Sequence, residues 1–172
     1  MIMECVSSVS YKIHVNGTET DEFVPTRGLR QGDPLSPYLF RICSEGLSSL
    51  LAHEQNIGGI EGVKVCRNAP SISHLLFADD SLILMKANIS NARTLKKVLE
   101  TYCQSSGQMV SNAKSSIYFS PNTGVSVRED IYRELNILTE ALSNTYLGLP
   151  SMVGVDKSDC FQHLIDQVCQ RL

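Results

Sequence analysis

Two adjacent aspartates, Asp79 and Asp80, are the residues of this sequence best placed to do chemistry. Each is flanked by an apolar run long enough for a buried strand, which predicts strands at Ile72–Ala78 and Ser81–Lys86 with the acids at the hairpin tip. Ionising neighbouring carboxylates at the edge of an apolar core is costly. Mg²⁺, which prefers carboxylate oxygen, removes that cost. The alternative is a solvated turn, because aspartate is a common turn residue, and on the dipeptide alone this alternative is favoured.

A Gly-rich, charged segment, Arg27–Pro34, holds the next candidate residues and is predicted to be a loop. Arg27 and Arg30 could contact phosphates, because a guanidinium group matches phosphate geometry. They could equally be ordinary exposed loop arginines, and the residues alone leave both possibilities open.

The helices that must position these segments are indicated by apolar residues at helical spacing. Ser36 and Pro37 are a typical N-cap and first helical residue, and Ser126 with Glu129 is typical of a capping box. Helices are therefore predicted at about residues 37–54 and 90–107, from 126 onward and from about 158 onward. Their expected core positions are Leu39, Cys43, Leu47, Leu50 and Leu51, then Leu95, Val98, Leu99 and Tyr102, then Ile131, Leu135 and Leu138.

A hairpin is predicted near the start, where strands Ser10–Val15 and Glu22–Val24 flank an Asn16-Gly17 turn whose residues tolerate positive φ. Mixed helices and hairpins favour an α+β fold over a doubly wound parallel sheet. Further short strands are expected at Ile60–Cys66, Lys114–Ser120 and Tyr146–Leu149.

The composition is that of an ordinary globular protein, with 42% hydrophobic and 19% charged residues among 172. This length suits one domain or a piece of a larger one. The net charge of −3 gives no electrostatic sign of nucleic-acid binding. Polar residues interrupt every apolar stretch before the roughly 18 residues of a membrane span, and no signal peptide is evident. We therefore expect an intracellular protein, nuclear or cytoplasmic, that does not contact membranes.

The six cysteines are spread along the chain without a C-x-x-C pair, which favours reduced core thiols. Cys160, His163 and Cys169 could share a helix face, but a structural zinc site needs four ligands and no fourth is evident. We expect no zinc site.

The sequence Phe77-Ala78-Asp79-Asp80 between apolar runs resembles the aromatic-x-Asp-Asp hairpin of reverse transcriptases. Upstream, Arg27–Pro37 resembles the family signature R-G-x-x-Q-G-x-x-x-S-P, in the family's order and with a predicted helix between the two motifs. Ser106-Gly107-Gln108, Lys114-Ser115 and Tyr146–Pro150 also match. Over essentially the whole chain the sequence resembles the reverse transcriptases of plant LINE-type non-LTR retrotransposons.

The resemblance implies a fragment of a polymerase palm over residues 1–145, with helices on one face of an antiparallel sheet that carries the Asp-Asp hairpin. A primer-grip-like strand and the first thumb helix would follow over residues 146–172. The implied activity is RNA-directed DNA polymerase, in which two Mg²⁺ ions promote attack of a primer 3′-hydroxyl on a dNTP. The implied partners are an RNA template, a DNA primer, dNTP and the remainder of a polyprotein.

At the metal site, the resemblance implies that Asp79 is a metal ligand and Asp80 a weaker, supporting ligand. Phe77 would pack near the primer terminus. Lys114 matches the family's fourth motif, in which a lysine donates a proton to pyrophosphate, although a solvated lysine at a strand end is an equal alternative.

At the nucleotide site, the resemblance implies that Gln31 and Gly32 line the nucleotide and template pocket, with Arg27 and Arg30 beside them. Glycine there lets the backbone approach the substrate closely. The two acids are expected to face the concave surface at which Gln31 and Gly32 also arrive.

The family also requires an earlier aspartate, which family order puts ahead of Met1, and no residue of this sequence matches it. The chain by itself is therefore expected to bind metal poorly, to lack useful polymerase activity and to have an unpaired sheet edge. The alternative is a non-enzymatic retrotransposon remnant with at most weak nucleic-acid binding.

Overall fold

The computed structural model describes residue 4, residues 7–26 and 28–140, residues 145–146 and 149–150, and positions 166 and 169. The chain divides into two compact units, Met1–Val110 and Ser111–Leu172, and each is described by itself. Within the described residues, no helix is long and apolar enough to cross a membrane.

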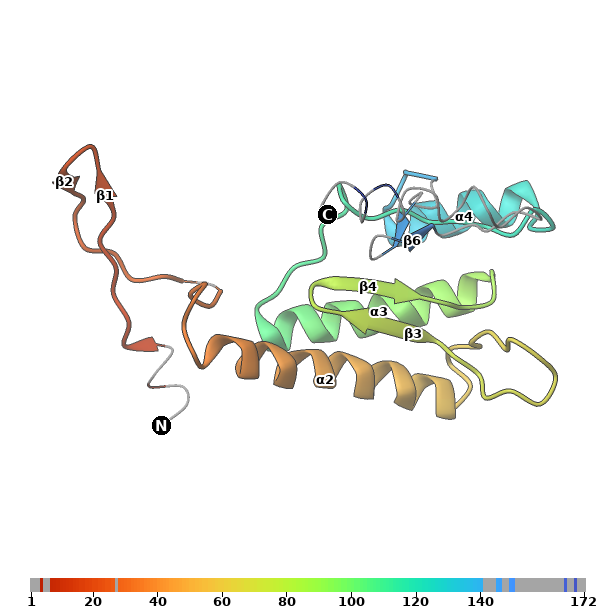
Figure 1. Cartoon of the computed structure of the whole chain (residues 1–172). Helices are drawn as coiled ribbons and strands as arrows, with labels where there is room; N and C mark the ends of the chain where they lie inside the picture. The colour runs from red at the N-terminus through yellow and green to blue at the C-terminus, as the bar shows by residue number, and fades with distance from the viewer. Residues whose placement is uncertain are drawn as a thin grey trace. The chain divides into compact units, whose positions relative to one another are not determined.

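Helices α2 (Ser36–Asn56) and α3 (Ile89–Ser106) pack together and form the centre of the first unit (Figure 1). Both were predicted from their apolar spacing. Helix α3 starts earlier than expected because the side chain of Asn88 accepts a hydrogen bond from the Asn91 backbone N–H, 2.7 Å away, and so caps the helix. The buried side chains of this unit are Leu47, Leu51, Ile60, Ser73, Asn91, Ala92, Leu95, Val98 and Tyr102.

Strands β3 (His74–Phe77) and β4 (Asp80–Ile83) form an antiparallel hairpin, and β3 packs on α2. Alternate residues of β3 are half-buried and exposed, so only one face of the strand is covered. Leu75 and Phe77 lie on the open face, which corrects the expectation of fully buried strands.

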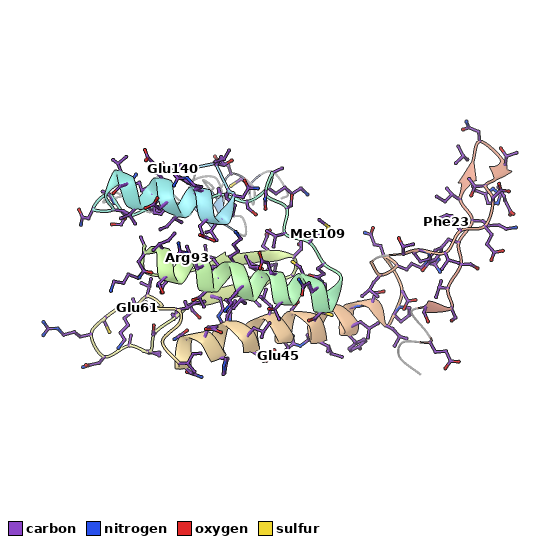
Figure 2. All side chains as sticks on the ribbon, turned by 180° about the vertical axis from the view of Figure 1, so that it is seen from behind. Phe23, Glu45, Glu61, Arg93, Met109 and Glu140 are labelled. Carbon is purple, nitrogen blue, oxygen red and sulfur yellow. The ribbon has the colours of Figure 1, made fainter. Side chains whose placement is uncertain are left out.

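Strands β1 (His14–Val15) and β2 (Thr18–Glu19) form a second, exposed hairpin around the Asn16-Gly17 turn. Both turn residues have positive φ, 52° and 84°, as the sequence predicts. The predicted second strand at Glu22–Val24 is reduced to one bridge between Tyr11 and Phe23, whose rings are 6.1 Å apart; Phe23 is labelled in Figure 2.

The second unit contains α4 (Val125–Leu135) and the paired strands β5 (Thr145–Tyr146) and β6 (Leu149–Pro150). Ile131 and Phe119 are buried, and the Tyr132 ring meets Phe119 edge-on with centroids 5.2 Å apart. Arg128 lies over the Phe119 ring and donates hydrogen bonds to Glu140 and to two backbone carbonyls. The helix predicted from about residue 158 lies outside the described residues apart from positions 166 and 169, which are helical.

Two further predicted strands are wrong, like Glu22–Val24. Of Ile60–Cys66 only Val63 pairs, with Ile72, and of Lys114–Ser120 only Ile117 pairs, with Glu140. Each segment has strand-like residues, but a strand forms only where a neighbouring segment offers its backbone groups along several residues.

Three helix-end predictions are also wrong. Ser36 is the first residue of α2 rather than its cap, and α4 is capped by the Gly124 backbone without the predicted Ser126–Glu129 box. Leu138 lies beyond α4, because Asn136 adopts the left-handed conformation that ends the helix, and it is 82% exposed instead of buried.

Candidate functional site

The turn between β3 and β4 consists of Ala78 and Asp79, and Asp80 is the first residue of β4, opposite Phe77. Ala78 has a φ of 48°, a value that non-glycine residues seldom adopt. Asp79, Asp80 and Phe77 are all exposed. The tight turn thus presents two carboxylates and one aromatic ring at the closed end of the hairpin.

The two carboxylates make no hydrogen bond or ion pair with any described residue, so their oxygens are free to bind a ligand. Mg²⁺ prefers carboxylate oxygens as ligands, so the two side chains could supply part of the coordination sphere of one Mg²⁺ ion. No group of three or more potential metal-binding side chains occurs among the described residues. The donor set therefore fits a divalent ion, but it supplies two carboxylates rather than a full coordination sphere.

The base of the hairpin is held on α2 by a small polar cluster. His74 Nε2 lies 2.8 Å from Ser48 Oγ on α2, and His74 Nδ1 lies 2.9 Å from Ser73 Oγ. Ser73 is buried, and its carbonyl accepts the Leu84 backbone N–H, which closes the hairpin beyond β4. Burial lowers the pKa of His74 below its ordinary value of 6.5, which favours the neutral imidazole.

The loop ahead of α2 forms an open cleft that holds the second group of predicted residues. Arg30, Gln31 and Gly32 line it together with Phe40 of α2 and Gln108, which follows α3. Gly32 has a φ of 88°, so the loop needs glycine at this turn. Arg27 lies outside the described residues.

The side chain of Arg30 is only partly available, because its guanidinium carbon lies 5.7 Å from the centre of the Tyr11 ring. This cation–π contact ties the loop to the segment that carries β1 and β2. Arg30 therefore has a structural role, the contact with Tyr11, in addition to any contact that it makes with phosphate.

The acidic pair does not line the cleft that holds the loop residues. No described residue of the β3–β4 hairpin lines the cleft at Gln31 and Gly32. The closed end of the hairpin points toward the end of α2 that carries the loop (Figure 1). The two sets of residues therefore lie in the same unit, at separate positions.

Residues 1–161 match the family described as reverse transcriptase (RNA-dependent DNA polymerase). The chain belongs to the reverse transcriptase family. Members of this family are RNA-directed DNA polymerases that act on nucleic acids and generally depend on a divalent metal.

Similar proteins include an uncharacterized mitochondrial protein of Arabidopsis thaliana, 54% identical over 67 residues, which are 39% of this chain and 55% of that protein. The Pol polyprotein of the type-1 retrotransposable element R2 of Popillia japonica is 35% identical over 94 residues, 55% of this chain and 14% of the polyprotein. The Pol polyprotein of the type-2 retrotransposable element R2DM of Drosophila melanogaster is 35% identical over 85 residues, which are 49% of this chain and 7% of that polyprotein. This reverse transcriptase chain thus spans about half of the mitochondrial relative and 14% or less of either polyprotein.

The remaining predicted residue of this reverse transcriptase chain, Lys114, belongs to the second unit. It is exposed and lies in a turn, where its backbone N–H donates to the Ser111 carbonyl over 3.0 Å. The predicted strand Lys114–Ser120, which would have begun at this lysine, is reduced to the single bridge at Ile117 among the described residues.

Gln108 lines the cleft from outside the loop and α2, and sequence reasoning gave it no role. It appears in the sequence only as part of the Ser106-Gly107-Gln108 match. Its position in the cleft depends on where α3 ends and on the hydrogen bond between its amide and Tyr102. Neither can be predicted from residue types alone.

Proposed function

We propose that the chain is the part of an RNA-directed DNA polymerase that carries the metal-binding hairpin and the nucleotide-binding loop. The observation that carries this proposal is the exposed Asp79-Asp80 pair at a two-residue β-turn, in a chain that matches the reverse transcriptase family. The substrates would be an RNA template, a DNA primer and a dNTP.

In this proposal Asp79 is the principal ligand of a divalent ion, most simply Mg²⁺, and Asp80 supports it. Such an ion would activate the attacking primer hydroxyl and stabilise the charge that develops on the leaving pyrophosphate. Exposure of both carboxylates, with no competing partner among the described residues, supports the assignment. Phe77, across the turn from Asp80, offers an exposed ring against which the primer terminus can pack.

The loop residues Gln31 and Gly32, with Arg27 and Arg30, would bind the nucleotide and the template. Lys114 would donate a proton to the departing pyrophosphate. The proposed division is a partial palm over residues 1–145, followed by a primer-grip strand and the start of a thumb over 146–172. The short paired strands β5 and β6 are compatible with a hairpin at the start of the latter segment.

We further propose that polymerisation requires more of a polyprotein than this chain. Two carboxylates leave much of the coordination sphere of a divalent ion unfilled, and no third acidic side chain joins them among the described residues. The length of the R2 polyproteins is consistent with this context.

Primer extension tests the proposal. The purified 172-residue chain is incubated with an RNA template, an annealed DNA primer, dNTPs and either Mg²⁺ or Mn²⁺, beside an Asp79→Asn variant. We expect no incorporation by either protein. Incorporation that disappears in the variant would support the polymerase assignment and contradict the requirement for a longer chain.

A non-enzymatic retrotransposon remnant is the second candidate. The Arabidopsis relative favours it, because 67 aligned residues make up 55% of that protein, which is therefore far shorter than a Pol polyprotein. Reading the DNA that flanks the coding sequence separates the candidates. An in-frame upstream segment that encodes the missing aspartate supports the polymerase, and stop codons or frameshifts support the remnant.

A further inference from the structure

Gln108 is the residue of the cleft that comes from outside both the loop and α2. The cleft is lined by residues from Leu29 to Pro34, by the first turns of α2 and by Gln108. Figure 2 marks the next residue, Met109, where the chain leaves α3. Gln108 thus joins the cleft from the segment that follows α3.

The chain turns sharply to bring Gln108 to this position. Gly107 ends α3 in the left-handed conformation, with a φ of 71°, and its N–H bonds to the Cys103 carbonyl. The Gln108 backbone N–H then donates to Ser106 Oγ over 3.2 Å, and Ser106 Oγ donates to the Tyr102 carbonyl over 2.7 Å. These bonds fix the backbone from which the Gln108 side chain extends.

The orientation of the Gln108 amide is set by Tyr102. The Tyr102 hydroxyl donates a hydrogen bond to Gln108 Oε1 over 2.8 Å. This bond engages the amide oxygen, and the two N–H donors of the same amide have no partner among the described residues.

Tyr102 is itself held firmly. It is 8% exposed, in the core of the first unit. Burial raises the pKa of Tyr102 above its ordinary value of 10.0, so the hydroxyl keeps the proton that it donates to Gln108. The amide is therefore oriented before any ligand arrives.

The polar groups at the cleft favour a ligand that accepts hydrogen bonds and carries negative charge. Gln31 and Gln108 offer amide donors, and Arg30 offers a positive charge. The acidic residue that lines the cleft is Asp33, and its Oδ1 accepts a hydrogen bond from the Leu35 backbone N–H over 2.8 Å. Phosphate oxygens have this chemistry and match a guanidinium group as well.

We propose that Gln108 binds the phosphate oxygens of a nucleoside triphosphate in this cleft, and that Tyr102 is the positioning residue that holds its amide for that contact. The inference rests on the proposed nucleotide role of the loop and adds to it a residue from the segment that follows α3. Tyr102 does not touch the ligand. It acts through the amide of Gln108.

The test is a titration of the full ¹⁵N-labelled chain with dTTP, followed by NMR, with the Gln108 side-chain amide as the reporter. Gln108→Met removes the donors and keeps the length of the side chain. Tyr102→Phe removes only the orienting hydroxyl and keeps the packing. Gln104→Met, at an exposed position of α3 outside the cleft, is the matched control.

We expect dTTP to shift the Gln108 amide resonances in the wild type. The dissociation constant should rise about tenfold in Gln108→Met and about threefold in Tyr102→Phe, and should stay unchanged in Gln104→Met, because a hydrogen bond to a charged group is worth more than the bond that orients it. Tripolyphosphate should produce the same Gln108 shift, and thymidine should not.

Three results would overturn the inference. Binding of dTTP with equal affinity by wild type and Gln108→Met would remove Gln108 from the site and leave the role of the loop intact. A shift with thymidine but not with tripolyphosphate would exclude phosphate as the group recognised. No dTTP binding by the wild-type chain would contradict both this inference and the proposed nucleotide site.

Discussion

Ala78 holds the two-residue turn in a conformation that side chains disfavour, with φ at 48°. It is exposed, so a substitution there changes backbone strain without changing packing. We predict that Ala78→Val lowers the free energy of unfolding of the first unit by about 1–2 kcal/mol, because a β-branched residue tolerates positive φ poorly, while Ala78→Gly stays within about 1 kcal/mol of wild type. Urea denaturation measures both. Equal stability of the Val variant and the wild type would show that the turn is unstrained.

Gly62 lies where two segments approach closely, because a Cβ built there would be 2.6 Å from the Ile72 carbonyl oxygen. Gly46, in α2, would meet nothing within 4 Å. Gly62→Ala should therefore break the Val63–Ile72 bridge and destabilise the first unit by about 1–3 kcal/mol. Gly46→Ala should stabilise it by about 0.5–1 kcal/mol, because alanine loses less backbone entropy in a helix. Thermal melts of the two variants should shift in opposite directions, and a shared direction would contradict the close approach of Gly62 to Ile72.

Tyr132 gives the second unit a predictable response to high pH. Burial and then the neighbouring Glu140 carboxylate raise the pKa of Tyr132 to about 12. Its folded-state pKa exceeds the unfolded value of about 10, so its contribution to stability is complete below pH 10 and is lost as the pH rises toward 12. The free energy of unfolding should fall less steeply over this window in Tyr132→Phe than in wild type. Identical slopes would contradict the assigned environment.

At the scale of the element, the hairpin and α2 are joined by the contact between His74 and Ser48. Burial depresses the pKa of His74, so the stability that depends on its neutral form is present above pH 6.5 and is lost as the pH falls below that value. We predict that His74→Gln removes this acid-dependent loss, seen as a flatter free energy of unfolding between pH 7.5 and 5. His53→Gln, at an exposed position of α2, is the control, and an equal change of slope in both variants would contradict the role given to His74.

The helices and the two tight hairpins were readable from the sequence, whereas the other strands were not, for a physical reason. The apolar stripes of α2 and α3 follow from local spacing, and Leu47, Leu51, Leu95 and Val98 are buried as expected. Strands at Ile60–Cys66 and Lys114–Ser120 depend on partners outside any tight turn, and only single bridges, to Ile72 and to Glu140, form there. The same limit applies to the cleft, since Gln108 acquires its place from Tyr102 and from a loop more than 70 residues upstream.

At the scale of the whole molecule, the described strands pair only in twos, which leaves the outer edges of β3 and β4 unpaired within the described residues. Leu75 lies on the open face of β3 and is 46% exposed. Unpaired edges beside exposed apolar residues promote association. We predict that the recombinant chain associates with rising concentration and that Leu75→Lys reduces this association. Light scattering coupled to size exclusion measures it, with Leu138→Lys as an exposed control outside any strand. Equal effects of the two substitutions would show that the strand is not the contact.

Asp79 and Asp80, as the metal-binding pair of a reverse transcriptase segment, are the centre of the proposed function. The most direct measurement is paramagnetic broadening of backbone amide NMR signals of the 172-residue chain by substoichiometric Mn²⁺, which detects weak sites. Glu129 and Asp130, another adjacent and exposed acidic pair, provide an internal control. We predict selective broadening around residues 77–81 that an Asp79→Asn, Asp80→Asn double variant abolishes. Equal broadening around Glu129 and Asp130, or broadening near the hairpin turn that survives in the double variant, would contradict the assignment.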